Sequence, residues 1–237
     1  IQKGEVTKDK CKIGYVGAFP YAEVISGFTS FYLGVKSVCD SATMEVKYTN
    51  SWASFDLEKE CAEQLIADGC VLISQHADTT GAPTACEAKK VPCVGYNIDM
   101  IPTAPDAALT SATINWGPYY TYAVQSVIEG TAIDTDWSKG VKDGADAITE
   151  LNDKTIAKGT KEKVEEAQKG IEDGTIHVFD TSKFTVGGKT LEELVESGDE
   201  DATKLQSYIK DGYFHESDVA GGMTSAPAFT FIIDGID

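Results

Sequence analysis

The stretch KIGYVGAFPYAEVISGFTSFYLGVKSV, residues 12–38, decides the fold of this chain. Its first part, KIGYVGAF (12–19), is a short apolar run of the kind that forms a buried strand. Its second part, 22–38, repeats apolar residues at helical spacing, which predicts one buried helix face made by Val24, Ile25, Phe28, Tyr32 and Val35. A buried strand that leads directly into an amphipathic helix predicts an α/β protein.

The same order continues downstream. Further strands are expected at 43–52, 70–75, 91–96 and 108–115, and further helices at 56–69, 82–90 and 118–130. In the helix at 56–69 the pattern predicts that Leu57, Cys61 and Leu65 are buried. Strands separated by helices of this length favour a three-layer αβα sandwich with a mainly parallel sheet covered on both faces.

The rest of the chain is less regular. A solvated helix is expected at 160–172, a hairpin around Gly187–Gly188, and a helix near 199–210. We therefore divide the chain into a lobe at 1–130 and a crossover with a C-terminal segment at 131–237.

Charge narrows the choice of partners. The net charge is −18, from 38 acidic and 20 basic residues, so phosphate backbones and anionic lipid surfaces are repelled and we expect no nucleic acid partner. No run approaches the roughly 20 apolar residues that span a bilayer. The chain starts at Ile1, and we expect that any signal peptide is absent or already removed.

The cysteine pattern leaves two alternatives open. Six cysteines are compatible with disulfides or with reduced core thiols, and the pairs that are placed to bridge are Cys86 with Cys93 and Cys11 with Cys39. There is no C-x-x-C pair and the three histidines are scattered, so we expect no metal site.

Polar and aromatic residues recur where the predicted strands end. In an open parallel sheet, ligands bind beyond the carboxyl ends of the strands. The candidate ligand-binding residues at these ends are Phe19, Trp52, His76, Asp78, Thr79, Asn97, Asp99, Asn115 and Trp116. Rings can stack on a planar ligand, while amide, carboxylate and hydroxyl groups can hydrogen-bond to it. Taken singly, each has a structural alternative, as a core residue, a turn residue or a helix cap.

Sequence signals for catalysis are sparse. The chain has no G-x-S-x-G elbow, no phosphate loop and no H-E-x-x-H helix, and Gly14 and Gly17 lack the third glycine of a dinucleotide fingerprint. His76 with Asp78 leaves acid–base chemistry as an alternative, but no nucleophile accompanies the pair. We expect a binding protein without a cofactor rather than an enzyme.

Five segments, in this order and spacing, resemble the basic membrane protein family of solute-binding lipoproteins, which includes purine-nucleoside receptors of ABC importers. They are the opening stretch, NSW (50–52), ISQHADTTG (73–81), VGYNIDM (94–100) and NWGPYY (115–120). The resemblance implies a type I periplasmic-binding-protein fold and an extracytoplasmic protein that closes on a small ligand at a hinge. It also implies an ABC permease as partner and a membrane link only through a lipid anchor outside this chain.

The resemblance also brings two departures. The matched segments correspond to the second lobe of the family, and we expect no first lobe in this chain, so 131–237 either packs on the lobe at 1–130 or completes the missing one. Nucleoside-binding members have an acid and a lysine that contact the sugar. At the corresponding positions this chain has Asn97 in place of the acid and Ile114 in place of the lysine. An uncharged amide holds a ribose diol less well than a carboxylate.

These observations lead to one functional hypothesis and one rival. The chain is expected to serve an ABC importer as a substrate-binding protein that recognises a purine base or a related heterocycle. The rival is a ligand-sensing ectodomain with the same fold, in which the ligand is reported to a signalling partner.

Overall fold

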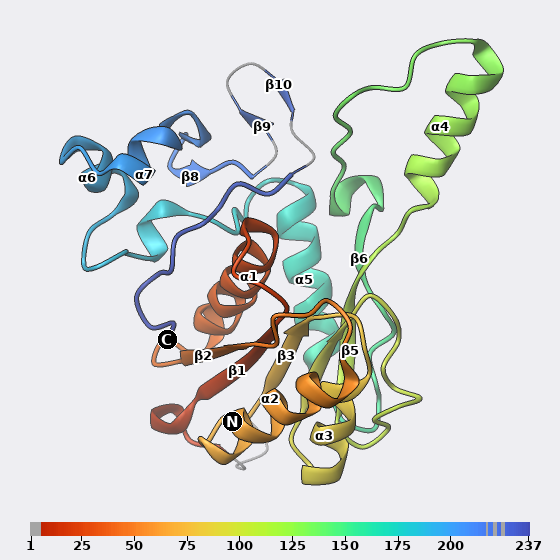
Figure 1. Ribbon diagram of the computed structural model, residues 1–237, viewed down its shortest axis with the longest axis vertical. Helices are drawn as coiled ribbons and strands as arrows, with labels where there is room; N and C mark the ends of the chain where they lie inside the picture. The colour runs from red at the N-terminus through yellow and green to blue at the C-terminus, as the bar shows by residue number, and fades with distance from the viewer. Residues whose placement is uncertain (1–5, 217, 220–221, 224–225) are drawn as a thin grey trace.

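The computed structural model describes residues 6–216, 218–219, 222–223 and 226–237. A six-stranded sheet with the order β2-β1-β3-β4-β5-β6 forms the centre (Figure 1). All neighbouring strands are parallel except β6, which runs antiparallel to β5. The predicted mainly parallel sheet is confirmed, with strands β1 (Lys12–Gly17), β2 (Thr43–Tyr48), β3 (Ile73–His76), β4 (Cys93–Tyr96), β5 (Ala108–Ile114) and β6 (Asp146–Ile148).

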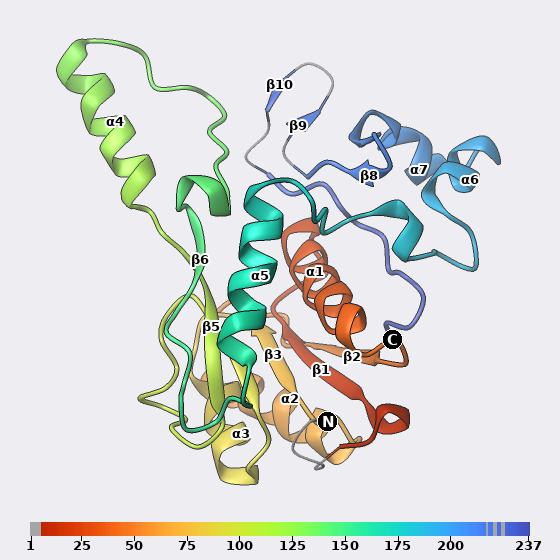
Figure 2. The same cartoon turned by 180° about the vertical axis from the view of Figure 1, so that it is seen from behind.

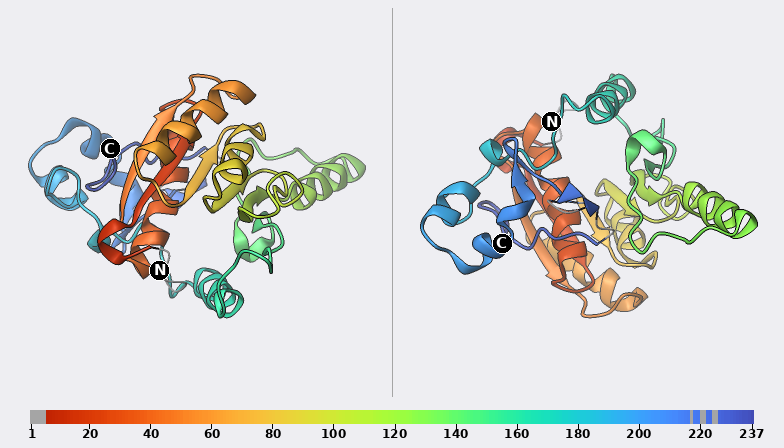
Figure 3. Two further views of the ribbon diagram at one scale, coloured as in Figure 1. Left: turned by 90° about the horizontal axis from the view of Figure 1, so that it is seen from below. Right: turned by 90° about the horizontal axis from the view of Figure 1, so that it is seen from above.

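Helices lie on both sides of this sheet. Helices α2 (Phe55–Ala67) and α3 (Gly81–Lys89) lie on the face turned toward the viewer in Figure 1. Helices α1 (Ala22–Val38) and α5 (Thr160–Glu172) lie on the opposite face, which Figure 2 turns forward. The two end-on views in Figure 3 separate the layers. The three-layer αβα arrangement predicted from the sequence is confirmed.

The buried face of α1 agrees with the prediction. Val24, Ile25, Phe28 and Tyr32 are all buried in one hydrophobic cluster with strand residues of β1 and β2, whereas Val35 is only partly buried and packs against that cluster.

Helix α2 buries a different set of residues from the set that the sequence predicted. Leu57 is 43% exposed, whereas Glu58, Ala62 and Leu65 are fully buried. The apolar pattern alone favoured Leu57. The Glu58 carboxylate, however, accepts the Thr79 N–H from the loop after β3 and the Ser54 N–H just before α2, and these bonds hold it inside. The predicted burial of Leu57 is therefore wrong, and Cys61 is only partly buried, whereas the predicted burial of Leu65 is confirmed.

The C-terminal part contains short elements: α6 (Leu191–Glu196), α7 (Glu200–Lys204), β7 (Ile209–Lys210), β8 (Tyr213–Phe214), β9 (Asp218–Val219) and β10 (Gly222–Met223). The helix expected near 199–210 is shorter than predicted, because α7 ends at Lys204 and β7 begins at Ile209. The hairpin is confirmed: Val186 pairs with Lys189, and Gly187 and Gly188 both have positive φ, at 58° and 79°.

This C-terminal segment packs against α1 and the β2 edge of the sheet. Phe229 is fully buried among the rings of Phe179, Phe184 and Phe214, in the same cluster as the core face of α1. The chain end then pairs with β2, since the Met44 N–H donates to the Gly235 carbonyl at 2.8 Å.

Helix α4 (Gly117–Glu129) leaves the body of the molecule and projects beyond the sheet (Figure 1). Its exposed apolar side chains are Tyr120, Val124, Val127 and Ile128. Within the described ranges, no helix has the length and apolar character that crossing a bilayer requires.

Candidate functional site

Backbone hydrogen bonds join the loops that follow the first three strands. The Ala18 N–H donates to the His76 carbonyl at 3.1 Å, and the Thr49 N–H donates to the Gly17 carbonyl at 2.9 Å. The Asp78 N–H donates to the Trp52 carbonyl at 2.8 Å. Because these strands are parallel, their carboxyl ends meet at one edge, which the loop contacts hold together.

A row of rings follows this edge from β1 to β4. Phe19 stacks on Tyr21 with ring centroids 5.1 Å apart, and its centroid lies 5.5 Å from that of Trp52. Trp52 approaches His76 edge to face at 6.4 Å, and His76 contacts Tyr96 at 4.4 Å. We call these five residues the aromatic row. The outer rings, of Phe19, Tyr21 and Trp52, keep exposed area, so a planar ligand has a surface to stack on.

His76 is the buried member of the row. Burial lowers the pKa of its imidazole, while the Glu23 and Asp78 carboxylates act in the opposite direction. Its Nε2 lies 3.7 Å from a Glu23 oxygen and has no hydrogen-bond partner within the described part of the chain. Because Nε2 is buried, a ligand can reach it only if the side chains that cover it move aside.

Asp78 and Asn97 form a polar pair beside the row. The Asn97 side-chain amide donates to the Asp78 carboxylate at 3.2 Å, and both residues are exposed. Asn97 has a φ of 67°, a left-handed conformation that asparagine tolerates better than most residues. The Thr113 hydroxyl donates to the Asn97 carbonyl at 2.7 Å and fixes this turn. The pair therefore presents a carboxylate acceptor and an amide donor next to each other.

Glu58 belongs to this edge although the sequence analysis did not select it. Its two carboxylate oxygens each accept the Thr79 N–H at 3.2 Å, and the Thr79 hydroxyl accepts the Gly81 N–H at 3.1 Å. Burial raises the pKa of Glu58, and the hydrogen bonds oppose that rise. Glu58 thus orders the loop that carries Asp78. The signal in the sequence is its spacing from Ala62 and Leu65, which puts all three on one helix face.

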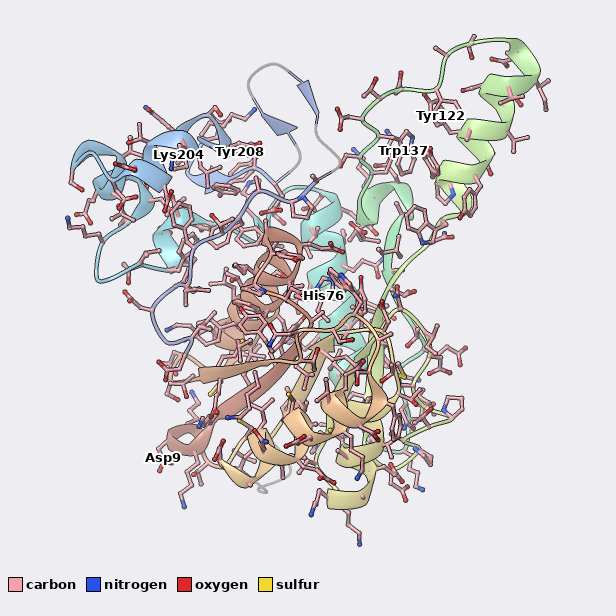
Figure 4. All side chains as sticks on the ribbon, viewed as in Figure 1. Asp9, His76, Tyr122, Trp137, Lys204 and Tyr208 are labelled. Carbon is pink, nitrogen blue, oxygen red and sulfur yellow. The ribbon has the colours of Figure 1, made fainter. Side chains whose placement is uncertain are left out.

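Three predicted site residues lie apart from the row. The Asp99 carboxylate accepts the Ile101 N–H at 2.9 Å, as a turn residue does. The Asn115 amide donates to the Gly144 carbonyl at 2.8 Å, and Trp116 stacks on Tyr120 of α4 at 6.1 Å. Figure 4 shows His76 in the body of the molecule and Tyr122 and Trp137, which stack on each other, at the projecting arm.

Two hollows of the surface lie away from the aromatic row. One of about 580 Å³ lies at the opposite, amino-terminal edge of the sheet, lined by residues such as Val71 and Val91. Another of about 220 Å³ lies between α1 and the C-terminal segment. No group of three or more metal-ligating side chains occurs in the portion of the chain that is described.

Fold and edge together define the class of protein, an α/β lobe with a candidate small-molecule site at the carboxyl ends of parallel strands. The sequence profile of the PnrA-like ABC transporter substrate-binding proteins, the Bmp family, matches residues 5–180. The chain belongs to this family, which is one of substrate-binding proteins and not of enzymes.

Two curated relatives differ in their ligands. A purine-binding protein of Brucella abortus (strain 2308) is 32% identical over 166 residues, which cover 70% of this chain and 47% of that protein. A putative ABC transporter glucose-binding protein, TsgA13 of Haloferax volcanii, is 30% identical over 182 residues, which cover 76% of this chain and 46% of that protein. The chain thus spans about half the length of the curated relatives it matches.

The fold is similar to that of solved solute-binding proteins. An ABC transporter solute-binding protein of Aeropyrum pernix K1 matches with a TM-score of 0.59 and 17% identity, over 82% of this chain and 67% of that protein. At this level of identity the likeness concerns the fold alone.

Proposed function

We propose that this chain supplies the ligand-binding lobe of an extracytoplasmic substrate-binding protein that delivers a purine base, or a closely related heterocycle, to an ABC importer. The observation that carries the proposal is the aromatic row beside the Asp78–Asn97 pair. The family assignment and the purine-binding relative support it.

Purine chemistry fits the two halves of the edge. A purine is a flat aromatic ring, and Trp52 or Phe19 offers the exposed face on which such a ring stacks. Its edge carries hydrogen-bond donors and acceptors side by side. The Asp78 carboxylate accepts from a ring or exocyclic N–H, while the Asn97 amide has a second N–H for a ring nitrogen or carbonyl.

The identity of residue 97 favours a base over a nucleoside. A ribose diol is bound best by a carboxylate that accepts from both hydroxyls, and here the position holds an amide already engaged with Asp78. Asp99, the other acid of this loop, has one oxygen committed to the Ile101 N–H. We expect ribose to contribute little to affinity.

The mechanism we propose is ligand-driven closure. A ligand held by this edge and by an opposing surface binds the closed state more tightly than the open state, and this difference in affinity shifts the protein toward closure. The permease then recognises the closed state. In this scheme a lipid anchor holds the protein at the membrane.

Calorimetry on the full-length protein, freed of bound ligand by unfolding and refolding, tests the proposal. We expect adenine, guanine or hypoxanthine to bind at least ten-fold more tightly than its nucleoside. The Asn97→Asp variant replaces the amide with a carboxylate, which can accept hydrogen bonds from both ribose hydroxyls. It should therefore reduce the difference in affinity between the base and its nucleoside. Tight binding of glucose with no binding of any purine would refute the proposal.

A further inference from the structure

Two pairs of cysteines lie where the strands begin, at the edge opposite the aromatic row. Cys11 directly precedes β1, and Cys39 directly follows α1. Cys86 lies in the last turn of α3, and Cys93 is the first residue of β4. Asp9, two residues before Cys11, marks this lower edge in Figure 4, well away from His76.

Backbone contacts bring Cys11 and Cys39 together. The Thr43 N–H donates to the Cys11 carbonyl at 3.1 Å, and the Ala42 N–H donates to the Cys39 carbonyl at 3.0 Å. The same short connection into β2 thus fixes both residues. Cys39 is buried in the main hydrophobic cluster, and Cys11 packs against that cluster while keeping some exposed area.

The two thiols of this pair are unequal. The hydrogen bond between the Cys39 sulfur and the Ser41 hydroxyl, 3.6 Å apart, is the main cause that lowers the pKa of Cys39, and contact with Cys11 adds to it. Burial, together with the same sulfur–sulfur contact, raises the pKa of Cys11 to about 11. Cys39 is therefore the sulfur that becomes a thiolate more readily, and the thiolate is the nucleophile in disulfide exchange.

Cys86 and Cys93 form a buried pair. They are 0% and 2% exposed, respectively, and belong to the cluster between α3 and the sheet. The Val91 N–H donates to the Cys86 carbonyl at 3.0 Å and turns the chain from α3 into β4. A hydrogen bond between the two side chains, followed by burial, raises the pKa of Cys86.

The remaining two cysteines serve as an internal contrast. Cys61 has Glu60, Lys47 and Glu58 as its charged neighbours. Cys70 has Lys12 and Glu45 among its charged neighbours, and no cysteine is among the groups acting on either thiol in the described structure.

All six cysteines are free thiols in this structure. We propose that Cys11–Cys39 and Cys86–Cys93 are disulfide-forming sites that close under oxidising conditions, and that Cys61 and Cys70 stay reduced. Each pair loses two protons and two electrons as its S–S bond forms, and a disulfide oxidant, either glutathione disulfide or a protein disulfide, accepts them and becomes two thiols. The oxidant first forms a mixed disulfide with one cysteine, which the thiolate of the other then displaces. The Cys86–Cys93 bond forms during folding, because the folded protein shields both sulfurs from an oxidant.

Both cross-links act on stability and leave the candidate site untouched. The first ties β1 and α1 into one closed loop, and the second ties α3 to β4. Closing a loop restricts the unfolded chain, so the oxidised protein is the more stable one. The inference is independent of which ligand is bound.

Thiol counting by mass spectrometry tests the inference. The full chain is refolded with a mixture of reduced and oxidised glutathione, unfolded in denaturant without reductant, alkylated with iodoacetamide, and digested. We expect two alkylated residues, Cys61 and Cys70, and linked peptides joining Cys11 to Cys39 and Cys86 to Cys93. Any other count, or a link through Cys61 or Cys70, overturns the inference.

Two variants sharpen the count. Cys11→Ser should release Cys39 and raise the number of alkylated thiols to three, whereas Cys61→Ser should lower it to one. Reduction of the refolded wild-type chain should lower its melting temperature by roughly 5–15 °C. An unchanged melting temperature, or the same thiol count in the two variants, contradicts the inference.

Discussion

At the scale of single residues, Asn97 combines two roles that the sequence analysis treated as alternatives. Its positive φ makes it a turn residue, and the same turn directs its amide to the Asp78 carboxylate. A residue that ends a strand at the carboxyl edge of a parallel sheet is at once a turn former and a candidate ligand contact.

Trp52 is the residue whose loss should most reduce ligand binding. In the full-length protein, Trp52→Ala removes the ring that lies between Phe19 and His76. Because stacking of a base on an aromatic ring contributes about 1–3 kcal/mol, the affinity for the purine should fall roughly ten- to hundred-fold. Calorimetry with the tightest purine measures it. Tyr120→Ala, on exposed α4, is the control and should bind as wild type does; equal losses in both variants would exclude a specific role for Trp52.

Glu58 should affect the fold more than its exposed helix neighbours do. Glu58→Ala leaves the Thr79 N–H without its buried acceptor, which costs about 1–3 kcal/mol in the free energy of unfolding. Glu60→Ala, on the exposed side of the same helix, should cost less than about 0.5 kcal/mol. Urea denaturation of the two variants makes the comparison, and equal losses would contradict the assigned role.

The charge of Glu58 gives a pH dependence with a defined sign. Because its pKa is raised in the folded state, the folded chain binds this proton more tightly than the unfolded chain does. The contribution of this protonation to the free energy of unfolding is fully present below the ordinary glutamate pKa and is lost as the pH rises through the raised pKa of Glu58. Relative to wild type, Glu58→Gln should therefore become more stable across that window, and a constant difference would show that burial does not perturb Glu58.

At the scale of elements, the contact between α2 and α3 depends on a glycine at the start of α3. A Cβ on Gly81 would lie 2.3 Å from the Phe55 carbonyl oxygen, and backbone atoms cannot move aside as a flexible side chain does. A glycine within α1, Gly34, has open space around its missing Cβ.

These two glycines predict opposite outcomes for the same substitution. Gly81→Ala should destabilise the protein by about 1–3 kcal/mol through overpacking. Gly34→Ala should stabilise it by about 0.5–1 kcal/mol, because alanine is the better helix former. Thermal unfolding monitored by circular dichroism measures both, and a neutral Gly81→Ala would mean that α2 and α3 are farther apart than the structure has them.

At the scale of the whole molecule, the C-terminal segment shares one hydrophobic cluster with α1. Phe229→Ala opens a cavity at its centre and should cost about 3–5 kcal/mol while unfolding stays a single transition. Val38→Ala, at a position 77% exposed, is the control and should change little. Two separate transitions, detected by circular dichroism and by tryptophan fluorescence, would mean that the segment unfolds independently of the sheet.

The sequence by itself determined the local order of the fold. Apolar runs followed by amphipathic periodicity predicted strands β1 to β5, helices α1 to α5 and the Gly187–Gly188 hairpin, because these signals depend on near neighbours in the chain. It also predicted the edge at which Phe19, Trp52 and His76 meet, since parallel strands have only one carboxyl edge.

Only the tertiary structure decided which candidates lie together. It joined Asp78 to Asn97, put Asn115 and Trp116 at the base of the projecting α4, and buried Glu58 under the loop after β3. The physical reason is that long-range hydrogen bonds determine these positions. Periodicity indicates which side chains face the core. The Thr79 N–H that satisfies the buried Glu58 carboxylate comes from a loop 21 residues further along the chain, and the local pattern around Glu58 does not indicate that partner.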